Sequence, residues 1–527
     1  MRHIMKKAPS RFGKRRAVVL VAVQLLLIGH VVWWLASGNT ITPLEPSEGM
    51  SFAKEGVVNA GLILLSVAVL ATLIFGRYFC GWGCHLLLLQ DFCRWLLLRV
   101  GIRPRPFRSR LLRLIPIVAF LYMFLWPILV RLFLGNSAPA LTLQLTTNSF
   151  WATFPGPLES ILTLVVAGFV VVYLLGSKAY CTYACPYGAI LGAVDNFAVG
   201  RIRVNDACQQ CGKCTAACSS DVRVHEEVRD FGAVIDPNCM KTMDCIAACP
   251  NDALSFGFGK PAAFLKQRAE GRKSQIGVPT WPEEWLLLGA YAFGFFATHS
   301  LYGRFPFLLA LGFGMMAAFG ALTLKRLLQR RDLSFLGQHL KRKNVFTPRG
   351  WVYVLLIVCG TGLFGHSLWI QTHRWRRDSA FAATNFHRSL WLRGDFSAET
   401  ISDEANAAMD HAVAEAVWLN AHGLVREDLN LFVIGWNDLF DGSLDGFETR
   451  MLEILVHRPN FGEVQMQYAY FLMNLQRFHD ARLQLDAVSP RDPRYLDAQH
   501  SAIALQQRLG NEEDATQRAA ALEALGF

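Results

Sequence analysis

Charged residues are scarce in this chain. Only 18% of its 527 residues are Asp, Glu, Lys or Arg, whereas 53% are hydrophobic. A chain of this length is expected to form several domains, and one so poor in charge is not expected to lie wholly in water. The composition therefore predicts that much of the chain is buried in an apolar environment.

Lysine is absent from residues 371–527. This stretch holds 14 Arg and 23 acidic residues, a net charge of −9, while residues 1–370 hold 38 Lys and Arg and 18 acidic residues, a net charge of +20. The two parts are therefore expected to have different surroundings. The basic residues of the first part stand between long apolar runs, which is typical of membrane flanks. A nucleic-acid partner is not expected.

Nucleotide-binding motifs are missing, and cysteine is confined to one region. The sequence has neither a Gly-rich strand–helix turn for a dinucleotide nor a P-loop. Twelve of the 13 cysteines lie between Cys80 and Cys249, and none follows Cys359. Their spacings are tight and metal-like, and disulfides are rare in a reducing cytoplasm. Iron–sulfur ligation is therefore favoured over a disulfide framework.

Seven apolar runs predict membrane spans, since a span needs about 20 mostly apolar residues. The predicted spans are Val18–Leu35, Val57–Phe75, Leu114–Leu134, Ile161–Leu175, Trp285–Leu301, Phe305–Leu324 and Trp351–Ile370. Residues 86–100 are apolar but carry Asp91 and Arg94, so they are predicted to form an interfacial or re-entrant helix. Cys93 and Cys359, which belong to no motif, are expected in the core.

The spans and the cysteine motifs divide the chain into four predicted regions. Residues 1–177 form a membrane domain with four helices, residues 178–281 a two-cluster ferredoxin-like domain, residues 282–370 three more membrane helices, and residues 371–527 a soluble helical domain. The expected fold class is mainly α: a polytopic α-helical membrane protein with an inserted α+β ferredoxin module and a C-terminal α-helical TPR-like domain.

The basic loops predict the orientation in a bacterial inner (cytoplasmic) membrane. Seven Lys and Arg lie in residues 1–16, seven in residues 94–113 and eight in residues 325–349, and such loops face the cytoplasm. With seven spans, the ferredoxin-like domain is then cytoplasmic and the tail from residue 371 is periplasmic.

The strongest motif is a run of four cysteines with bacterial ferredoxin spacing. Cys208-x2-Cys211-x2-Cys214-x3-Cys218 lets three thiolates wrap one cluster while the fourth points to a partner cluster. In a two-cluster arrangement the first 4Fe–4S cluster is held by Cys208, Cys211, Cys214 and Cys249. The second cluster is left with Cys218, Cys239 and Cys245.

The second half of this motif lacks one cysteine. In "NCMKTMDCIAACP", from Asn238 to Pro250, Thr242 stands at the position of the fourth ligand. Three alternatives stay open: a three-iron cluster that needs no ligand at this corner, a four-iron cluster with an oxygen ligand from Thr242, Asp244 or water, or an empty site. Iron prefers thiolate, so the Thr242 hydroxyl is a poor substitute.

Two further cysteine pairs follow predicted spans. "GRYFCGWGCH" contains Cys80 and Cys84, and "GSKAYCTYACPYG" contains Cys181 and Cys185, at matching positions 101 residues apart. Both pairs follow spans that run in the same direction, so all four thiols are expected at one membrane depth. They could bind a further metal or cluster, act as two redox dithiols, or simply pack as small apolar residues.

The tail shows a 34-residue period. Pro459 and Pro493 are 34 residues apart, and so are Leu475 and Leu509. This period is typical of tetratricopeptide repeats, whose concave face binds a protein or peptide. A plain helical bundle is the alternative.

Together, "CGWGC", "CTYACPYG" and the paired ferredoxin motif resemble the membrane polyferredoxins related to the NapH, NosR and CcoG proteins of respiratory electron transfer and copper-oxidase assembly. The resemblance covers roughly residues 70–260. It implies iron–sulfur clusters on the seven ferredoxin cysteines. Thr242 departs from the family pattern, and so does His85, which stands in place of the usual proline. The TPR-like tail is not expected from this resemblance.

These features favour an electron carrier over an enzyme that converts a substrate. It would pass electrons between a cytoplasmic or quinone donor and a membrane or periplasmic acceptor, with respiratory redox proteins as partners. Two other functions stay open. One is a copper or metal reductase acting at the cysteine pairs. The other is a redox-sensing assembly factor for a respiratory complex, which recruits a partner through the tail.

Overall fold

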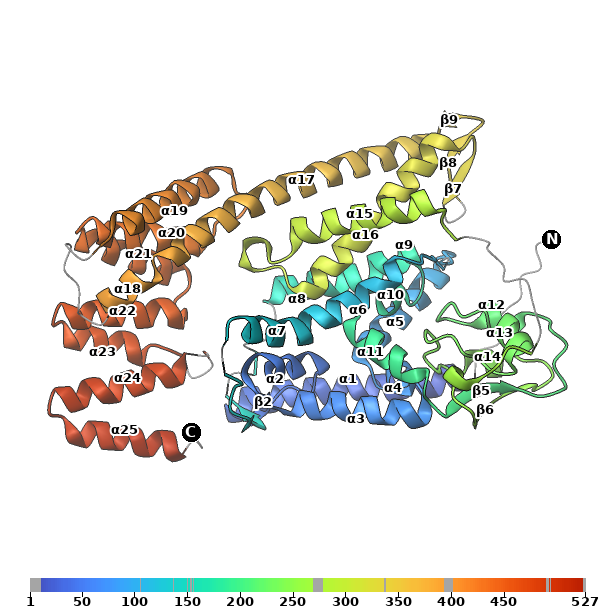
Figure 1. Ribbon diagram of the computed structural model, residues 1–527, viewed down its shortest axis with the longest axis horizontal. Helices are drawn as coiled ribbons and strands as arrows, with labels where there is room; N and C mark the ends of the chain where they lie inside the picture. Colours follow the sequence, from blue (N-terminus) through green and yellow to red (C-terminus); the bar gives the residue numbers. More distant parts are fainter. Residues whose placement is uncertain are drawn as a thin grey trace. The chain divides into compact units, whose positions relative to one another are not determined.

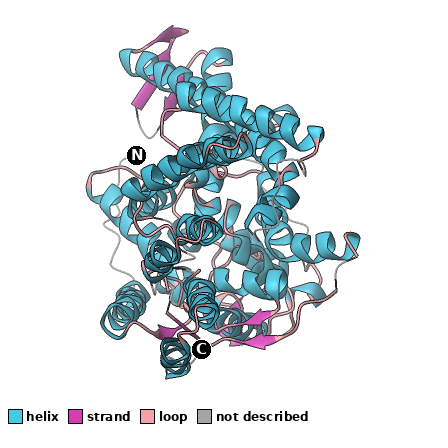
Figure 2. Ribbon diagram, turned by 90° about the vertical axis from the view of Figure 1, so that its left-hand side faces the viewer, coloured by secondary structure: helices cyan, strands magenta, loops and turns pink. Residues whose placement is uncertain are grey.

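The computed structural model describes residues 11–524 apart from 105, 136, 149, 152–153, 155, 269–277, 336–337, 393–400, 490–491 and 493. The described chain is mostly helical, with a few short strands (Figures 1 and 2). It divides into two compact units. The first comprises Met1–Thr147, Gly156–His299 and Phe305–Phe364, and the second comprises Asn148–Pro155, Ser300–Arg304 and Gly365–Phe527.

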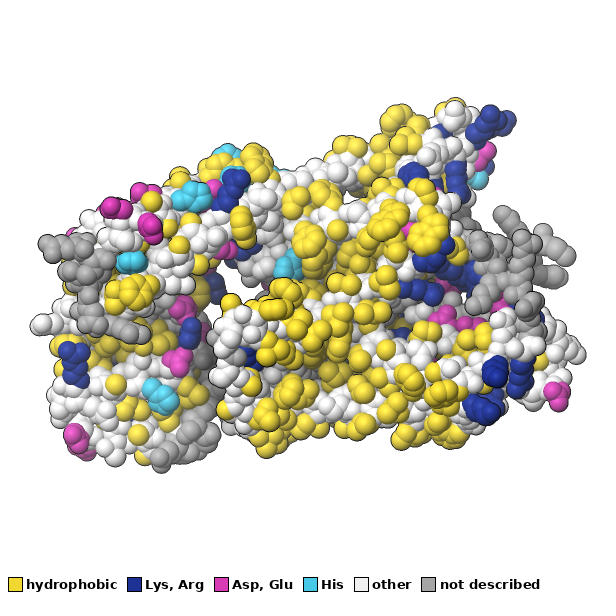
Figure 3. Space-filling view, viewed as in Figure 1, with side chains coloured by type: hydrophobic (Ala, Val, Ile, Leu, Met, Phe, Trp, Pro, Cys, Tyr) yellow, Lys and Arg dark blue, Asp and Glu magenta, His cyan; other side chains and the backbone are white. Residues whose placement is uncertain are grey.

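Five described helices are long and apolar enough to cross a membrane. They are Phe12–Ser37 within α1 (Arg11–Ser37), Leu112–Phe133, Pro157–Leu175, α16 (Phe307–Gln329) and α17 (Pro348–Ala383). Their outward side chains, such as Leu26, Phe133 and Leu356, are exposed. Hydrophobic side chains accordingly cover much of the visible face of these helices (Figure 3). The helices indicate a membrane protein.

Two of these helices are built from shorter pieces. Leu112–Phe133 consists of η2 (Leu112–Leu114), α6 (Ile115–Phe120), the π-helical η3 (Leu121–Leu125) and α7 (Trp126–Phe133). Pro157–Leu175 consists of α8 (Pro157–Leu164), the π-helical η4 (Val165–Val170) and α9 (Val171–Leu175).

Two of the seven predicted spans do not meet the length and composition of a membrane crossing. The helix predicted from residue 57 is α3 (Ala60–Phe75), which is apolar but has only 16 residues because Asn59 caps its start. The helix predicted at 285–301 is α15 (Trp281–Thr298), and its first turn carries Glu283 and Glu284. The count of seven spans and the sidedness therefore stay predictions.

Glycine lets α15 and α16 pack closely. A Cβ at Gly294 would lie 2.7 Å from that of Ala317, and a Cβ at Gly314 would lie 2.8 Å from the ring of Tyr291. Small residues at such a contact let helices in a membrane gain van der Waals packing. Buried side chains of α9 and α16, among them Val171, extend this core.

Residues 86–100 form the helix α5 (His85–Arg99). Leu87, Gln90 and Cys93 on this helix are buried, while Phe92 and Trp95 are exposed. The helix packs against α1, η4 and α9. Cys93 therefore lies in the core, as predicted. The same prediction for Cys359 is wrong, because this residue lies on the outward face of α17 and is exposed.

The chain segment that follows α11 (Pro186–Asp195) and precedes α15 folds into a small ferredoxin module (Figure 1). Two antiparallel strands, β5 (Gly200–Val204) and β6 (Leu254–Phe258), pair Ile202 with Phe256 at their centre. Between them run α12 (Lys213–Ala217), α13 (Val224–Phe231) and α14 (Asp244–Ala247). The buried side chains of this module include Ile202, Val228, Cys239 and Cys245, so the cysteine-rich loops are part of its core.

The remaining short elements of the first unit connect these parts. They are β1 (Thr40–Ile41) paired with β4 (Thr146–Thr147), β2 (Val57–Val58) paired with β3 (Thr142–Leu143), the helices η1 (Pro46–Gly49), α2 (Met50–Glu55), α4 (Tyr78–Trp82), α10 (Ala179–Tyr183) and η5 (Ala262–Phe264), and a sheet of β7 (Leu333–Phe335), β8 (Gln338–Arg342) and β9 (Val345–Phe346).

The second unit is a series of helices that pack as antiparallel pairs. Its helices are α18 (Asn385–Leu392), α19 (Asp403–His422), α20 (Asp428–Phe440), α21 (Leu444–His457), α22 (Gly462–Asn474), α23 (Phe478–Asp486), α24 (Tyr495–Arg508) and α25 (Glu512–Ala524). From α19 onward consecutive helices pack on one another, and α18 packs against α22, around a core that includes Trp436, Phe447 and Phe471. Pro493 lies outside the described residues, and the assignment as tetratricopeptide repeats stays a prediction.

Candidate iron–sulfur centres

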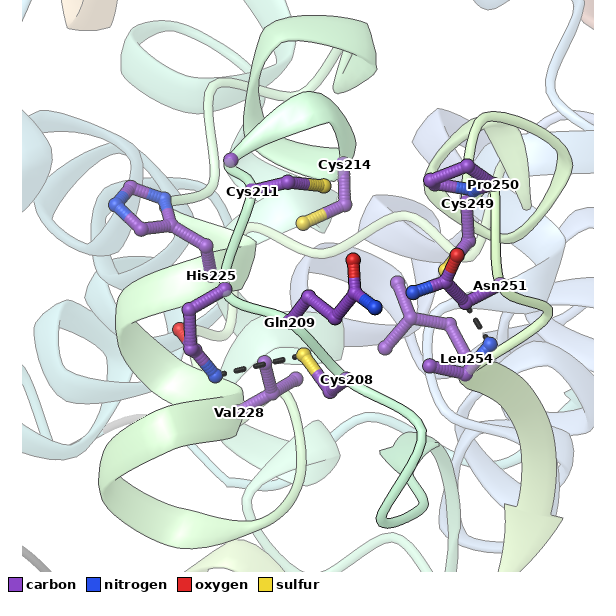
Figure 4. A pocket seen from close by; sticks show the side chains of 13 residues that line it. Cys208, Gln209, Cys211, Cys214, His225, Val228, Cys249, Pro250, Asn251 and Leu254 are labelled. Atoms are coloured by element: carbon purple, nitrogen blue, oxygen red, sulfur yellow. Dashed lines mark hydrogen bonds between the residues drawn. The ribbon is translucent and has the colours of Figure 1, made fainter.

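The four cysteines predicted to hold the first cluster line one pocket. Cys208, Cys211, Cys214 and Cys249 surround it together with His225. Their side chains lie around a common space in Figure 4. Three of them come from the loop before and within α12, while Cys249 follows α14. The tertiary fold therefore brings a distant cysteine to the local motif, as ferredoxin spacing predicts.

Two sulfurs of this first site accept hydrogen bonds. Gln210 Nε2 donates to Cys208 Sγ at 3.4 Å, and the backbone N–H of Ala253 donates to Cys249 Sγ at 3.3 Å (Figure 4). Cys211 is exposed, so one corner of the site faces outward. Hydrogen bonds to sulfur and solvent exposure both act on the potential of a cluster.

The three cysteines predicted for the second cluster also lie together, in a more enclosed position. Burial and, to a smaller extent, the nearby Cys239 raise the pKa of the Cys218 thiol to about 12. Burial also raises the pKa of Cys245 well above its usual range, with further contributions from Cys239 and Cys218. Cys239, Thr242 and Cys245 are 5–7% exposed. Buried thiols of this kind must give up their protons to bind a metal.

The loop around Thr242 repeats the backbone of the first loop. Gln210 and Lys241, at equivalent positions, have φ of 52° and 51°. Gly212 and Met243, two residues later, have φ of 71° and 62°, and each is the residue from which α12 or α14 starts. Left-handed backbone costs roughly 1–2 kcal/mol in a residue that carries a Cβ. Thr242 therefore occupies the backbone position of a cluster ligand, in a geometry that its surroundings impose.

The second loop is fixed from two sides. Trp82 Nε1 donates to the carbonyl oxygen of Lys241 at 2.9 Å. The backbone at Gly81 comes so close that a Cβ there would lie 2.0 Å from the Met240 carbonyl oxygen. The fully buried Nζ of Lys241 donates to Asp195 Oδ1 at 3.0 Å. The loop that carries Thr242 is thereby joined to the first membrane-surface cysteine motif.

The two membrane-surface motifs have the same local structure. Cys80 lies in the short helix α4 and Cys181 in the short helix α10. Cys84 and Cys185 are the N-cap residues of α5 and α11, with φ, ψ of −84°, 124° and −73°, 111°. His85 starts α5 as Pro186 starts α11. The histidine in place of the family's proline therefore leaves the local backbone unchanged.

All four membrane-surface thiols lie close to one another. Burial raises the pKa of Cys84 well above its usual range, and Cys181, Cys185 and Cys80 each raise it further. Burial raises the pKa of Cys185 to about 12, with additional contributions from Cys181 and Cys80. The structure therefore brings the two sequence repeats together at a single four-cysteine site.

A buried arginine lies beside these thiols. Arg77 is 2% exposed. Its Nη1 donates to the Pro237 carbonyl oxygen at 2.7 Å, and its guanidinium also faces the Cys80 thiol. Burial alone would lower the pKa of Arg77, and its neighbours Cys80, Cys181 and Cys185 raise it above the usual value. A positive charge is thus held against the four-cysteine site.

Further polar groups support the opposite side of the site. Gln90 Nε2 donates to Cys181 Sγ at 2.9 Å. Lys178, which takes the position of Arg77 in the second repeat, pairs with Asp91, and Arg16 Nη2 pairs with the same carboxylate at 2.8 Å. Burial alone would raise the pKa of Asp91, and its partners Lys178 and Arg16 hold that pKa below its usual value.

None of the three cysteine groups described above forms a site for a single metal ion. In the part of the chain that the structure describes, no three His, Cys, Asp or Glu side chains are close enough to hold one ion. An iron–sulfur cluster separates its ligands more widely, because several iron and sulfide atoms lie between the thiolates.

Sequence reasoning missed the charged and polar residues around the cysteines. Arg77, Gln90 and Asp195 are not residues that a cysteine-ligand motif predicts. One signal was present, because a basic residue, Arg77 or Lys178, precedes the first cysteine of each repeat by three residues. The sequence alone could not show that these side chains are buried.

Two family models match the regions just described. A model described as a 4Fe-4S binding domain matches residues 59–106 and again residues 160–205, so each match contains one membrane-surface cysteine pair. A model described as a 4Fe-4S dicluster domain matches residues 200–250. The 4Fe–4S ferredoxin-type domains predicted from the motifs are therefore confirmed.

Several curated proteins are similar to the same part of the chain. The ferredoxin-type protein NapH of Haemophilus influenzae is 28% identical over 211 residues, which is 38% of this chain and 67% of NapH. The methylamine utilization ferredoxin-type protein MauN of Methylorubrum extorquens is 26% identical over 244 residues, 44% of this chain and 82% of MauN. An uncharacterised protein of Methanocaldococcus jannaschii is 26% identical over 228 residues, 41% of this chain and 85% of its own length. No solved structure matches this chain. The resemblance to NapH-like polyferredoxins is thus confirmed.

Proposed function

We propose that this chain is a membrane-bound iron–sulfur protein that transfers electrons between a cytoplasmic or quinone donor and a membrane or periplasmic acceptor. One observation carries the proposal. The seven ferredoxin cysteines gather in two groups within one module, and that module is joined to the ends of apolar helices. The similarity to ferredoxin-type proteins supports it.

The proposed ligands of the first 4Fe–4S cluster are Cys208, Cys211, Cys214 and Cys249. A cluster bound there supplies one-electron chemistry. The chain itself orients the thiolates through α12 and the turn after α14. It also donates hydrogen bonds from Gln210 and Ala253 to two of the sulfurs.

The proposed ligands of the second cluster are Cys218, Cys239 and Cys245, and the cluster is of the three-iron or four-iron type. The fit rests on the retained loop backbone around Thr242, since an unused site would have no reason to keep two non-glycine residues in left-handed conformation. Burial of Cys239 and Cys245 keeps water away from this site.

Electron paramagnetic resonance of the full-length protein, purified anaerobically in detergent, tests this function. We expect a brown protein with iron and acid-labile sulfide, four-iron signals after reduction, and a three-iron signal before reduction if the second site holds that type. Cys208→Ser should remove one set of signals and Cys239→Ser another, while the control Cys359→Ser should leave both. Protein without iron would overturn the proposal.

The ferredoxin module is proposed to face the cytoplasm and the second unit the periplasm, following the basic loops. Protease treatment of right-side-out spheroplasts tests this orientation. We expect cleavage in the tail and protection of the ferredoxin module until the membrane is broken. Cleavage of the module in intact spheroplasts would reverse the orientation.

The tail is proposed to bind a protein or peptide of a respiratory complex through a TPR-like concave surface. Its paired helices from α19 to α25 support this role, because stacked helical hairpins form such surfaces. This binding is also compatible with an assembly factor. Removal of residues 401–527 should abolish recovery of the partner and leave the iron signals intact.

A further inference from the structure

The four-cysteine site places a buried positive charge beside four thiols. It combines four thiols from two repeats, the buried Arg77 guanidinium, which faces Cys80, Cys181 and Cys185, and Gln90, which donates to the sulfur of Cys181. An uncompensated buried cation is costly, and it is normally paired with an anion. Neutral thiols are poor partners for a guanidinium, so the site is built for a group with negative charge.

We propose that Cys80, Cys84, Cys181 and Cys185 jointly hold one 4Fe–4S cluster, shared between the two repeats, and that Arg77 is a positioning residue that supplies its counter-charge. The first matched 4Fe–4S domain holds three cysteines, Cys80, Cys84 and Cys93, and the second holds two, so neither repeat can complete a four-thiolate site by itself. Binding releases the four thiol protons, and the bound group then carries the negative charge that Arg77 faces.

The arrangement of the backbone suits this role. Cys84 and Cys185 cap the N-termini of α5 and α11, which have 15 and 10 residues. The positive end of a helix dipole stabilises negative charge at this position. Gly188 leaves room beside the cysteines, because a Cβ there would lie 2.8 Å from the Cys181 carbonyl oxygen and 3.1 Å from Arg77 Nη2.

The proposed cluster site adjoins the second ferredoxin site. Met240 is fully buried in a small apolar cluster with Leu20 and Leu87, and Cys80, Cys84 and Cys181 pack against this cluster. The preceding residue in the chain is Cys239, a proposed ligand of the second cluster. A single residue therefore separates the two groups of thiols, which is the closeness that electron exchange between them requires. This inference rests on the proposed function and adds a third redox site to it.

The test compares a Cys80→Ser, Cys181→Ser double variant with wild type in the full-length chain, purified anaerobically. We expect the variant to lose about four iron atoms per chain, with equivalent sulfide, while the signals of the two ferredoxin sites persist. Cys359→Ser serves as the control and should lose no iron. Unchanged iron in the double variant would overturn the shared cluster. So would intact disulfides at these cysteines in anaerobic wild-type protein, shown by mass spectrometry.

Arg77→Gln provides a second measurement if the double variant loses all its signals. Removing the counter-charge should lower the midpoint potential of one spectral component and leave the others in place, because the reduced group is the more negative one. Arg77→Lys keeps the positive charge, so its midpoint potential should lie close to that of wild type. Identical potentials in all three proteins would overturn the role of Arg77. If the wild-type protein shows no ferredoxin signals, the proposed electron-transfer function is wrong. If it shows them but the double variant keeps all its iron, only the shared cluster is wrong.

Discussion

The two loops of the ferredoxin module share one backbone but have opposite surroundings. In the first loop, Cys211 is exposed and the neighbouring Gly212 is in open space. In the second loop, the equivalent Thr242 is buried, and the loop is pinned by Lys241 and by the close approach of Gly81. The open loop has its full set of cysteines, and the enclosed loop lacks one.

This difference suggests how a site tolerates a missing ligand. An exposed corner without a thiolate is open to water and to loss of iron, whereas an enclosed corner is held by the packing around it. If the second site holds the proposed cluster, the tertiary contacts of the second loop replace part of what a fourth cysteine contributes. Four substitutions test whether burial of the second loop has this effect.

The largest effect is expected from Cys211→Thr, which gives the first loop the residue of the second. Because this corner is exposed, we expect occupancy of the first cluster to fall at least about tenfold. Iron analysis and the reduced spectrum measure it. Full retention of the first cluster would show that burial is not the reason why the second loop tolerates a missing cysteine.

The second-largest effect is expected from Asp195→Asn. It leaves the fully buried Lys241 ammonium without its carboxylate, and breaking a buried pair costs about 3–5 kcal/mol. The midpoint of thermal unfolding in detergent should fall, together with occupancy of the second site. The exposed Asp206→Asn in the same module is the matched control and should change little. Equal midpoints for both variants would contradict the anchoring role of Lys241.

Gly81→Ala tests the close approach on the other side of the loop. Its Cβ would lie 2.0 Å from the Met240 carbonyl oxygen, so the second loop must shift, at a cost of about 1–3 kcal/mol. We expect faster proteolysis within residues 238–250. Gly289→Ala, whose Cβ would have no atom within 4 Å, is the control.

Thr242→Cys should have the smallest effect on stability. The backbone already has ligand geometry, so we expect a change below about 1 kcal/mol. A three-iron signal in the oxidised protein should be replaced by a four-iron signal in the reduced protein. A spectrum that does not change would mean that the ligand order is wrong.

Much of the candidate site could be predicted from the sequence. The spacing of Cys208, Cys211, Cys214 and Cys218 depends on the short reach of the backbone around one cluster, which is a local property. The apolar helices were predictable for the same reason, although the helices at two of the predicted spans, α3 and α15, fall short of the length or hydropathy of a membrane crossing. The exposure of Cys359 was not predictable, because which face of a helix points outward depends on its neighbours.

The residues that bear the chemistry can be named from the sequence alone: the ferredoxin cysteines, the gap at Thr242 and the two matched pairs near the membrane. That those pairs meet, that Arg77 faces them and that Met240 lies between them and the second ferredoxin site follows only from the packing of the folded chain. Ligand spacing is set over a few residues of backbone, whereas burial, counter-charge and closeness between sites arise where segments more than 100 residues apart pack together.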